Sequence, residues 1–437
     1  MPDRPGQRLL RGFYSLAMYL LAPLTLYHLV WRGMRQPEYL QRWGERFGHL
    51  PSRPAAGALW VHAVSVGEVN AAQPLVNAFR AAHPGRRLVL TTVTPTGSAR
   101  ARALWGDAVE HLYLPYDMPG AVRRFLDHVR PEVGVIMETE IWPNLFCQCR
   151  DRGIPLLIAN ARLSARSLRG YAPLGPLVRM ALAAVRTVAA QSEADARRYL
   201  LLGAPEGAVI VTGNLKYEQR LDPALIPQAQ AWRARWGAAR PVWVAASTHE
   251  EETEAVVAAH RAVRERHPDA LLLWAPRHPE RFVSAVVLAR EAGFRTQCRS
   301  VDGLPGPETD CFVVDTLGEL NAFYAAADVA FVGGSLQAIG GHNLLEPAAL
   351  GVPAVVGPHT FNFVEVTRAL QAVDAVRQVP DAAGVAGAVV ALLDDAPLRR
   401  RMGEAGRGLV EAQRGALAHT LALVEALLPP AAAPPGA

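Results

Sequence analysis

The chain has very little lysine and cysteine for its length. Of 45 lysine and arginine residues in 437, only Lys216 is a lysine, and there are four cysteines. So few thiols do not make a disulfide framework, and the isolated Cys147-x-Cys149 pair lacks the partner cluster that a metal site needs. The composition fits a reducing compartment and predicts no bound metal.

Several common motifs are also missing. The chain has no H-E-x-x-H pair, no Walker loop and no well-placed G-x-G-x-x-G. Its net charge of +5 is spread along the chain without a basic run interleaved with aromatic residues. That pattern argues against nucleic acid as a partner, whereas an anionic membrane surface or an acidic substrate stays compatible with it.

One long apolar stretch lies near the N-terminus. Residues 13–31 carry no charge, approach the length that spans a bilayer and have arginines on both flanks, so the positive charges leave the orientation open. A signal peptide, a spanning helix and an anchor lying partly in the interface are the three interpretations. No small-x-small cleavage site follows closely, so we favour a retained membrane anchor over residues 1–35, with a kink at Pro23.

Short apolar segments alternate with alanine-rich segments from residue 59 onward, a pattern typical of parallel sheets covered by helices. Two series of strands are predicted, at residues 59–64, 88–92, 133–137, 156–159, 187–190 and 209–212, and then at 242–246, 271–275, 311–314, 329–332 and 354–356. The predicted fold class is therefore α/β, with two Rossmann-like doubly wound domains.

The domain boundaries follow from composition. Residues 36–220 form the first predicted domain, and residues 221–240, which are rich in proline, glutamine and tryptophan, form a linker. Residues 241–428 form the second domain, and the proline- and alanine-rich tail 429–437 is expected to be disordered. If the two domains face each other, the loops after their strands line a shared cleft, where such sheets bind ligands.

The stretch 328–359 is the most informative part of the second domain. Its strand ends at Gly333 and Gly334, where a ligand can approach the bare backbone. Asn343 and Glu346 have the spacing of a capping box and predict the start of a helix, whose N–H groups suit a phosphate while Glu346 accepts from ribose hydroxyls. The alternative is an ordinary αβ unit in which Glu346 is only a cap.

Two acidic motifs follow predicted strands of the first domain. Ser65 and Glu68 have capping-box spacing, so Glu68 is either a helix cap or a catalytic base. In METEIWPN, Glu138 and Glu140 share one face if the chain is still extended there. Arginines in the following ARLSARS, Arg162 and Arg166, are possible partners in a structural ion network, which is the alternative to a functional role.

Polar residues also follow predicted strands around the second domain. Ser247 and Thr248 precede an acidic stretch and are either helix caps or ligand-binding hydroxyls. Arg277 and His278 directly follow a strand, where an arginine is a natural anion ligand or the partner of a carboxylate. Lys216 lies near the predicted crossing between the domains. Because the chain uses arginine at every other basic position, the single lysine suggests a site that needs a compact ammonium group. The alternative is that this lysine has been retained by chance.

The family resemblance rests on eight stretches that occur in this order: HAVSVGE, METEIWPN, ARLSARS, TGNLKYE, ASTHEEE, RHPERF, DTLGEL and VGGSLQAIGGHNLLEPAALGVPAVVGPH. Together they resemble the 3-deoxy-D-manno-octulosonic acid (Kdo) transferases of lipopolysaccharide synthesis, from the anchor to about residue 370. The resemblance implies a GT-B glycosyltransferase architecture, CMP-Kdo as donor and a lipid A precursor (lipid IVA) as acceptor. It also implies the inner membrane, with the catalytic domains facing the cytoplasm.

The resemblance also implies roles for individual residues. Glu68 matches the family's proposed general base, which takes the proton from the acceptor hydroxyl as that oxygen attacks the anomeric carbon of Kdo with inversion. The CMP leaving group carries one phosphate, which Arg277, Lys216 and the N–H groups after Gly340 and Gly341 can stabilise, so neither a metal nor a cofactor is expected. The remaining donor-side residues of the matched motifs are Ser247, Thr248, His278, Gly334, Asn343 and Glu346. Glu138 matches a supporting position, and its role stays open.

Two departures and two other classes of function qualify this interpretation. Glu218 stands where the family pattern has aspartate, and Leu345 where proline is common. A sugar-nucleotide 2-epimerase shares the architecture but has no need of an anchor, and a non-catalytic membrane-bound nucleotide binder has no need of a base. The number of Kdo units transferred and the oligomeric state do not follow from the sequence.

Overall fold

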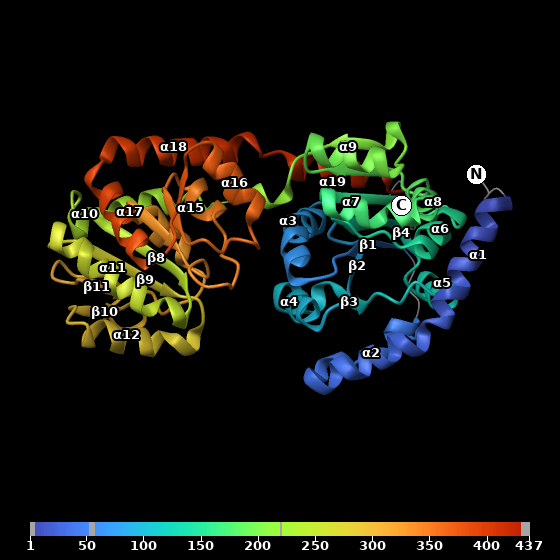
Figure 1. Ribbon diagram of the computed structural model, residues 1–437, viewed down its shortest axis with the longest axis horizontal. Helices are drawn as coiled ribbons and strands as arrows, with labels where there is room; N and C mark the ends of the chain where they lie inside the picture. The colour runs from blue at the N-terminus through green and yellow to red at the C-terminus, as the bar shows by residue number, and fades with distance from the viewer. Residues whose placement is uncertain (1–4, 52–56, 219–220, 430–437) are drawn as a thin grey trace, which may run out of the picture. The chain divides into compact units, whose positions relative to one another are not determined.

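The computed structural model describes residues 5–51, 57–218 and 221–429, and the chain divides into two compact units (Figure 1). Unit 1 comprises Met1–Glu218 and Arg414–Ala437, and unit 2 comprises Gln219–Gln413. The first four residues of the predicted anchor and residues 430–437 of the predicted tail lie outside the described residues.

Unit 1 is built on a parallel sheet in the order β3-β2-β1-β4-β5-β6-β7. Its strands are β1 Ala58–His62, β2 Arg87–Thr92, β3 Glu110–Tyr113, β4 Pro131–Met137, β5 Leu156–Ala161, β6 Thr187–Ala190 and β7 Val209–Val211. The direction of winding reverses between β1 and β4. The carboxyl ends of these two strands are therefore the place where a doubly wound sheet binds ligands.

Two helical layers cover the sheet of unit 1. Alternate residues along β1 enter different cores, Trp60 on one face and Leu59 and Val61 on the other, as the period of a strand requires. On the Trp60 face lie α5 Pro119–Val129, α6 Pro143–Asp151, α8 Gly175–Leu182 and α9 Glu193–Leu202. On the Leu59 face lie α3 Val66–Ala82, α4 Pro95–Trp105 and α19 Ala416–Leu427. The short α7, Ala165–Tyr171, follows β5.

Unit 2 has a parallel sheet in the order β10-β11-β9-β8-β12-β13-β14, with the reversal between β8 and β12. Its strands are β8 Val242–Thr248, β9 Leu271–Pro276, β10 Thr296–Cys298, β11 Cys311–Val313, β12 Val329–Val332, β13 Ala354–Val356 and β14 Val376–Gln378. Its helices are α10 Leu225–Trp236, α11 Thr253–Arg266, α12 Phe282–Glu291, α13 Arg299–Asp302, α14 Leu320–Ala326, α15 Leu345–Ala349, α16 Val364–Ala372, α17 Ala382–Asp394 and α18 Ala396–Ala412. The expectation of two doubly wound α/β domains is confirmed.

Three strands were missed by the sequence pattern, and each lies at the edge of its sheet. They are β3 (EHLY), β10 (TQC) and β14 (VRQ), which are three or four residues long and mix polar with apolar side chains. An edge strand has only one neighbouring strand and buries less of its surface, so it does not need the continuous apolar run that predicted the central strands.

The predicted boundaries between the domains differ from the observed division. The expected linker 221–240 contains α10, whose Trp232 and Trp236 are buried in the core of unit 2. At the other end, α19 belongs to unit 1. Glu218 fixes it there, because its Oε1 accepts from the backbone N–H groups of Gly415 at 2.7 Å and Leu417 at 3.0 Å.

The N-terminal apolar stretch forms two helices instead of one. They are α1 Pro5–Leu20 and α2 Ala22–Arg35, bent by 44° at a break where Pro23 occupies the first turn of α2, which confirms the expected kink. Among the described residues, no single helix meets the length and hydropathy that a bilayer crossing requires, and this bent pair meets them only when its halves are taken together.

Candidate functional site

Glu68 lies in the first turn of α3, where the loop after β1 enters the helix. Its Oε2 accepts from the backbone N–H of Val64 at 2.8 Å, while the Ser65 side chain makes no capping bond. The predicted capping box is therefore not formed. Burial raises the pKa of Glu68 to about 8, and the nearby Glu138 and Glu140 add to the rise while Val64 and Lys216 oppose it. A buried carboxylate with this pKa is a much stronger base than an ordinary glutamate.

Glu138 is the first residue after β4, the strand next to β1. It has a φ of 56°, a left-handed conformation that costs a non-glycine residue about 1–3 kcal/mol. Backbone hydrogen bonds hold it there: its N–H donates to Ala159 at 3.0 Å, and its carbonyl accepts from the Tyr199 hydroxyl at 2.8 Å. The chain turns at this residue, so the expected extended arrangement of Glu138 and Glu140 is wrong.

Lys216 reaches the same end of the sheet from the short helix η6, Leu215–Tyr217. Its Nζ lies 3.4 Å from Oε1 of Glu138. This ion pair gives Glu138 a different partner from the arginines that the sequence suggested. Because Lys216 also acts on the pKa of Glu68, the ammonium and the two carboxylates belong to one electrostatic group.

A network of amide side chains positions Lys216, and the sequence analysis missed it. Asn160 Oδ1 accepts from the N–H of Leu215 at 2.9 Å, and its carbonyl accepts from Gln191 Nε2 at 2.9 Å. Gln191 Oε1 in turn accepts from Asn214 Nδ2 at 3.0 Å, and Asn214 Oδ1 accepts from the N–H of Lys216 at 2.9 Å. The available signal was three amides near the carboxyl ends of strands, Asn160 at the end of β5 and Gln191 and Asn214 after β6 and β7, because the carboxyl ends of parallel strands lie at one edge.

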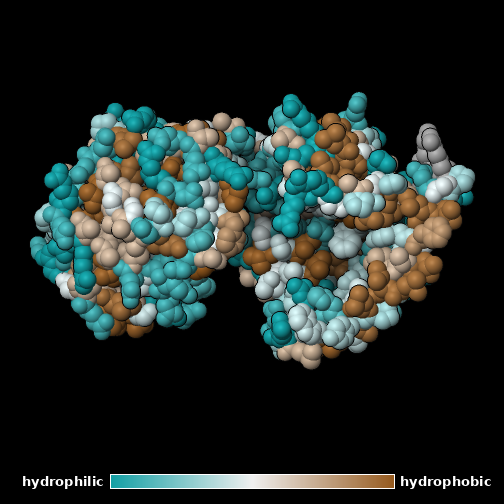
Figure 2. Space-filling model, viewed as in Figure 1, coloured by the Kyte–Doolittle hydropathy of each residue, from teal (hydrophilic) through white to brown (hydrophobic). Residues whose placement is uncertain are grey.

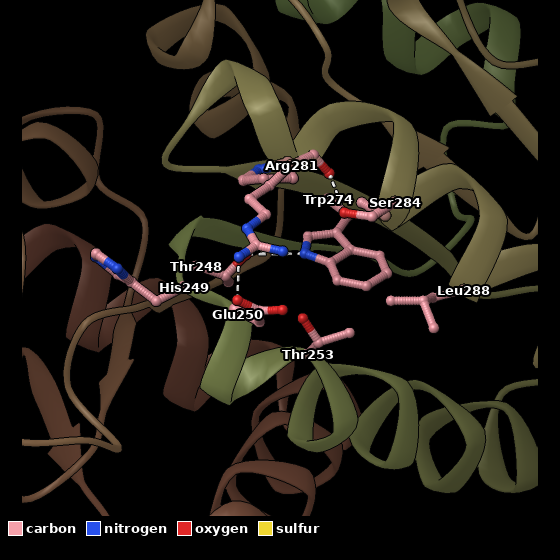
Figure 3. A pocket seen from close by; sticks show the side chains of 10 residues that line it. Thr248, His249, Glu250, Thr253, Trp274, Arg281, Ser284 and Leu288 are labelled. Carbon is pink, nitrogen blue, oxygen red and sulfur yellow. Dashed lines mark hydrogen bonds and ion pairs between the residues drawn. The ribbon is translucent and has the colours of Figure 1, made fainter.

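Ser247 and Thr248 end β8 in unit 2 and do not cap a helix. Ser247 has a φ of 54° and sits where the pairing of β8 with β9 changes register. Thr248 Oγ1 accepts from the indole N–H of Trp274 at 2.9 Å. Thr248 and Trp274 line a pocket, together with Thr253, Ser284 and Leu288 (Figure 3). An ion pair between Arg281 and Glu250 lies at this pocket. The capping interpretation of the two hydroxyls is wrong.

Glu252 organises the glycine-rich loop after β12, and the sequence analysis did not identify it. Its fully buried carboxylate accepts four backbone N–H groups: Oε2 from His249 at 3.0 Å and Gly334 at 2.7 Å, and Oε1 from Ser335 and Leu336, both at 3.0 Å. The N–H of Gly334 is thus bound to the protein's own carboxylate. An acidic residue early in the helix after β8 was the signal, but nothing in the sequence shows which of the three consecutive glutamates turns inward.

The second half of this loop is held by its own backbone. Gly340 and Gly341 have φ angles of 110° and 76°, which explains why glycine stands at both positions. The N–H of Gly341 donates to the carbonyl of Gly334 at 2.6 Å, and the carbonyl of Gly340 accepts from the N–H of Asn362 at 2.9 Å. Of the N–H groups expected to face a phosphate, the one that follows Gly340 is therefore engaged within the loop.

Asn343 and Glu346 contact each other at the start of α15. Asn343 Nδ2 donates to Glu346 Oε1 at 3.0 Å, and Asn343 Oδ1 accepts from the N–H of Leu345 at 3.1 Å. The helix begins at Leu345 with Leu344 as its N-cap, one residue later than a capping box with Asn343 at the N-cap predicts. Burial raises the pKa of Glu346, while Asn343 and Arg277 oppose the rise, so Arg277 lies within electrostatic reach of this carboxylate. Arg277 follows β9 and donates its N–H to the carbonyl of Thr248 at 3.0 Å.

Each unit thus gathers its own predicted residues at the carboxyl end of its sheet. Unit 1 brings together Glu68, Glu138 and Lys216, and unit 2 brings Arg277 close to Thr248, Glu346 and the glycine-rich loop. Unit 1 can accept a proton, and unit 2 offers cationic and imidazole groups to an anion.

Solved structures share this two-unit fold. MurG of Acinetobacter baumannii superposes with a TM-score of 0.53 at 12% identity, covering 85% of this chain and 100% of its own. The UDP-GlcNAc 2-epimerase of Neisseria meningitidis superposes with a TM-score of 0.53 at 12% identity, covering 84% of this chain and 100% of its own. Fold and sites together define a two-domain α/β protein of this architecture.

The sequence comparisons are more specific. The family model for 3-deoxy-D-manno-octulosonic-acid transferase (kdotransferase) matches residues 41–219. The 3-deoxy-D-manno-octulosonic acid transferase of Haemophilus influenzae is 41% identical over 96% of this chain and 99% of its own length, and that of Bordetella pertussis is 42% identical over 95% and 99%. The chain belongs to the 3-deoxy-D-manno-octulosonic acid (Kdo) transferase family and is a glycosyltransferase, as the resemblance implied.

Proposed function

We propose that this protein transfers Kdo from CMP-Kdo to a lipid A precursor, with inversion at the anomeric carbon and Glu68 as the general base. The observation that carries the proposal is the buried Glu68 carboxylate, held at the switch point of unit 1 with its pKa raised to about 8. A base of that strength takes the proton from a sugar hydroxyl more readily than an ordinary glutamate does. The acceptor oxygen then attacks the anomeric carbon from the face opposite the departing CMP.

Unit 1 is the proposed acceptor domain and unit 2 the proposed CMP-Kdo domain. Lys216, fixed by its amide network and paired with Glu138, is the proposed contact for a phosphate or carboxylate of the reactants. Glu138 supports this position by orienting the ammonium. We assign no metal to the reaction, because the cations of the chain itself can stabilise the single phosphate of the leaving CMP.

The donor contacts are proposed along the carboxyl ends of β8, β9 and β12. Arg277 and His278 would bind the phosphate or the Kdo carboxylate, and Glu346, oriented by Asn343, would accept from the ribose hydroxyls. Ser247, Thr248, Gly334, Gly340 and Gly341 would shape the loops that receive the nucleotide. For Gly334 and Gly341, whose N–H groups are engaged, the proposed contribution is the close approach that a missing side chain allows.

We also propose that α1 attaches unit 1 to the membrane by lying along its surface. The inner side of α1 is held by the protein: Tyr14 donates to Asp117 at 3.0 Å, Ser15 donates to Asn144 at 3.0 Å, and Arg11 pairs with Asp151 at 2.7 Å. A helix held in this way along its length cannot also cross a bilayer away from the unit.

The outer side of α1 and α2 supports the same proposal. Large apolar side chains are exposed along both helices, and hydrophobic surface follows them in Figure 2. They include Leu9, Phe13, Leu16, Leu20, Leu24, Tyr27 and Met34. An amphipathic helix of this kind lies in the interface with its apolar face among the acyl chains, which would keep the active site near a lipid substrate at the cytoplasmic face of the inner membrane.

Product mass tests the proposed reaction directly. The full-length protein in detergent is incubated with CMP-Kdo and the lipid A precursor, and in parallel with UDP-N-acetylglucosamine alone. We expect the acceptor mass to increase by one or more Kdo residues and the UDP sugar to remain unchanged. Epimerised UDP sugar with unmodified lipid would instead indicate an epimerase. If neither mixture gave a product, the remaining interpretation would be a non-catalytic nucleotide-binding protein.

A further inference from the structure

Three histidines from three separate loops of unit 2 meet beside Arg277. His249 follows β8, His278 follows β9, and His342 lies in the glycine-rich loop after β12. His249 and His342 face each other with their Nε2 atoms 2.8 Å apart, and the ring of His278 meets that of His249 edge-on at a centroid distance of 5.3 Å. The proposed transfer reaction uses only His278, so the close pair has no role so far.

The short contact between His249 and His342 fixes how the pair holds its protons. Two ring nitrogens at 2.8 Å form a hydrogen bond only when one carries hydrogen and the other does not. Each ring can be neutral in that arrangement. One further proton can be added at Nδ1 of the ring that donates through Nε2, because the Nδ1 of the accepting ring already carries hydrogen. The bond between the rings is kept, so the pair is able to change its charge by one at constant geometry.

Burial, and after it the positive charges that face the pair, disfavours protonation of the two imidazoles while no anion is bound. Burial lowers the pKa of His342, and with the contributions of Arg277, His249 and His278 that pKa is about 4. The pKa of His249 is lowered by burial and by His278 and Arg277, while Glu252 and Glu251 oppose this. Glu252 is a weak counterion, since its oxygens already accept four backbone N–H groups.

An anion beside Arg277 would reverse this balance, because it offsets the positive charge that disfavours protonation. Glu346, the other carboxylate within electrostatic reach of Arg277, is already bound by the Asn343 side chain at 3.0 Å. The three imidazoles are not a metal centre, since no three such ligands are suitably grouped among the residues that the structure describes. The chemistry that remains is anion binding coupled to a proton.

We propose that the His249–His342 pair takes up one proton when the phosphate of a nucleoside monophosphate binds beside Arg277, and that it keeps this proton while the phosphate leaves the sugar. The proposal rests on the proposed function for the identity of the nucleotide. The bond from the anomeric carbon to the phosphate oxygen breaks with its electron pair on the phosphate, and the acceptor oxygen forms the new bond to carbon. The acceptor's proton goes to Glu68. The proton on the pair comes from solvent on binding and returns to solvent when CMP departs.

Calorimetry of CMP binding measures this proton. CMP is titrated into full-length protein at pH 7 in two buffers of different ionisation enthalpy, and the difference in observed enthalpy gives the protons taken up. We expect wild-type protein to take up about one proton per CMP, and its Kd to rise by up to about tenfold per pH unit above neutrality. Binding without any buffer dependence, and with a Kd independent of pH, would overturn the proposal.

Matched substitutions locate the proton. His342→Asn and His249→Asn should each abolish the buffer dependence and weaken CMP binding at least about tenfold, because a neutral amide cannot take up the charge. His419→Asn, on the exposed side of α19 in unit 1, should leave proton uptake unchanged. Unchanged uptake in both pair variants would overturn the proposal, and the pH dependence of the wild-type Kd decides the matter if neither variant folds.

The same experiment separates this proposal from the proposed function. If wild-type protein binds CMP and transfers Kdo without taking up a proton, the function stands and the role of the pair is wrong. If wild-type protein binds no CMP, both the donor assignment and the role of the pair are wrong.

Discussion

In both units the candidate site lies at the carboxyl end of a parallel sheet, where the direction of winding reverses. The site of unit 1 is rich in carboxylates, whereas that of unit 2 is rich in basic side chains. In unit 1 the loops after β1 and β4 carry carboxylates, and burial raises the pKa of Glu68 to about 8. In unit 2 the loops after β8, β9 and β12 carry Arg277 and imidazoles, and burial lowers the pKa of His342 to about 4. Burial favours the uncharged form in both, since it penalises charge of either sign.

The comparison shows that sheet topology determines where each site lies, whereas the side chains determine its chemistry. The reversal of winding places a site at β1 and β4 in one unit and at β8 and β12 in the other. The side chains then determine which reactant each site suits. In our proposal, the Glu68 carboxylate, which loses its proton near pH 8, is a base strong enough to take the proton of an acceptor hydroxyl, and the guanidinium with its neighbouring imidazoles binds an anionic nucleotide.

The strongest test of the comparison removes the base of unit 1. Glu68→Gln keeps the size of the side chain but cannot take a proton, so we expect the transfer rate to fall by about a hundredfold or more. CMP binding, which we assign to unit 2, should be unchanged when measured by calorimetry. Near-normal turnover by the folded variant would mean that Glu68 only binds the backbone N–H of Val64 and is not the base.

Lys216→Arg tests whether the lone lysine of unit 1 is matched to its position. The arginine keeps the charge, but its planar head directs its donors differently beside Glu138. We therefore expect the variant to lose most of its turnover, about tenfold or more, at saturating donor and acceptor, with unchanged thermal stability. Lys216→Ala should be only modestly worse. An arginine variant with wild-type turnover would make the single lysine an accident of composition.

The pH dependence of wild-type protein tests the base without any substitution. Because the pKa of Glu68 is about 8, its ionised fraction, and with it the transfer rate, should rise about tenfold between pH 7 and pH 9. Stability should change in the opposite direction. The folded protein binds the Glu68 proton more tightly than the unfolded chain does, so this contribution is complete below about pH 4.5 and is lost as the pH rises through about 8.

Glu68→Gln is the control for both pH effects. It should flatten the rise in rate and remove the loss of stability with pH, as measured by chemical denaturation at several pH values. A rate profile that keeps its rise in this variant would assign the titration to another group.

Glu252→Gln tests how unit 2 uses its buried carboxylate. The amide nitrogen of glutamine cannot accept the backbone N–H groups that the carboxylate now accepts, which leaves buried donors unsatisfied. We expect the free energy of unfolding to fall by about 1–3 kcal/mol, seen as a lower Tm. Glu251→Gln, at an exposed position in the same turn, is the matched control and should change little. Equal effects of the two substitutions would show that the four hydrogen bonds do not stabilise the loop.

Much of this arrangement could be predicted from the sequence, and the rest had physical reasons for being missed. Central strands are buried on both faces and therefore read as apolar runs, whereas the edge strands β3, β10 and β14 do not. Glu68, Arg277 and Glu346 could be proposed as candidates because each lies in a loop or first helical turn after a strand, within a recognisable motif. The linker was misjudged because a proline-rich segment also contained the two tryptophans of α10 that enter a core.

The missed contacts depend on long-range geometry. Nothing local relates Glu252 to Gly334, or His249 to His342, although each pair lies close together in the folded unit. Their positions become neighbours only because β8 and β12 pair at the centre of the sheet. Topology therefore had to be known before either contact could be inferred.

The smallest expected change in turnover concerns α1, a helix at the surface of unit 1 that we assign to membrane attachment and not to the transfer site. Deleting residues 1–35 would remove the hydrogen bonds of Tyr14 and Ser15 to Asp117 and Asn144, so we expect a folded, active but less stable protein.

The sharper variant keeps the helix and combines Phe13→Ser, Leu16→Ser and Leu20→Ser, at side chains that are 63%, 55% and 72% exposed. Sedimentation with anionic vesicles should be lost, while turnover of detergent-dispersed acceptor stays unchanged, because the base and the cations lie elsewhere. The control combines Val283→Ser, Val301→Ser and Leu317→Ser, which are 76%, 80% and 71% exposed in unit 2, and should sediment like wild type. If the α1 variant were folded but inert toward dispersed acceptor, α1 would belong to the acceptor site itself.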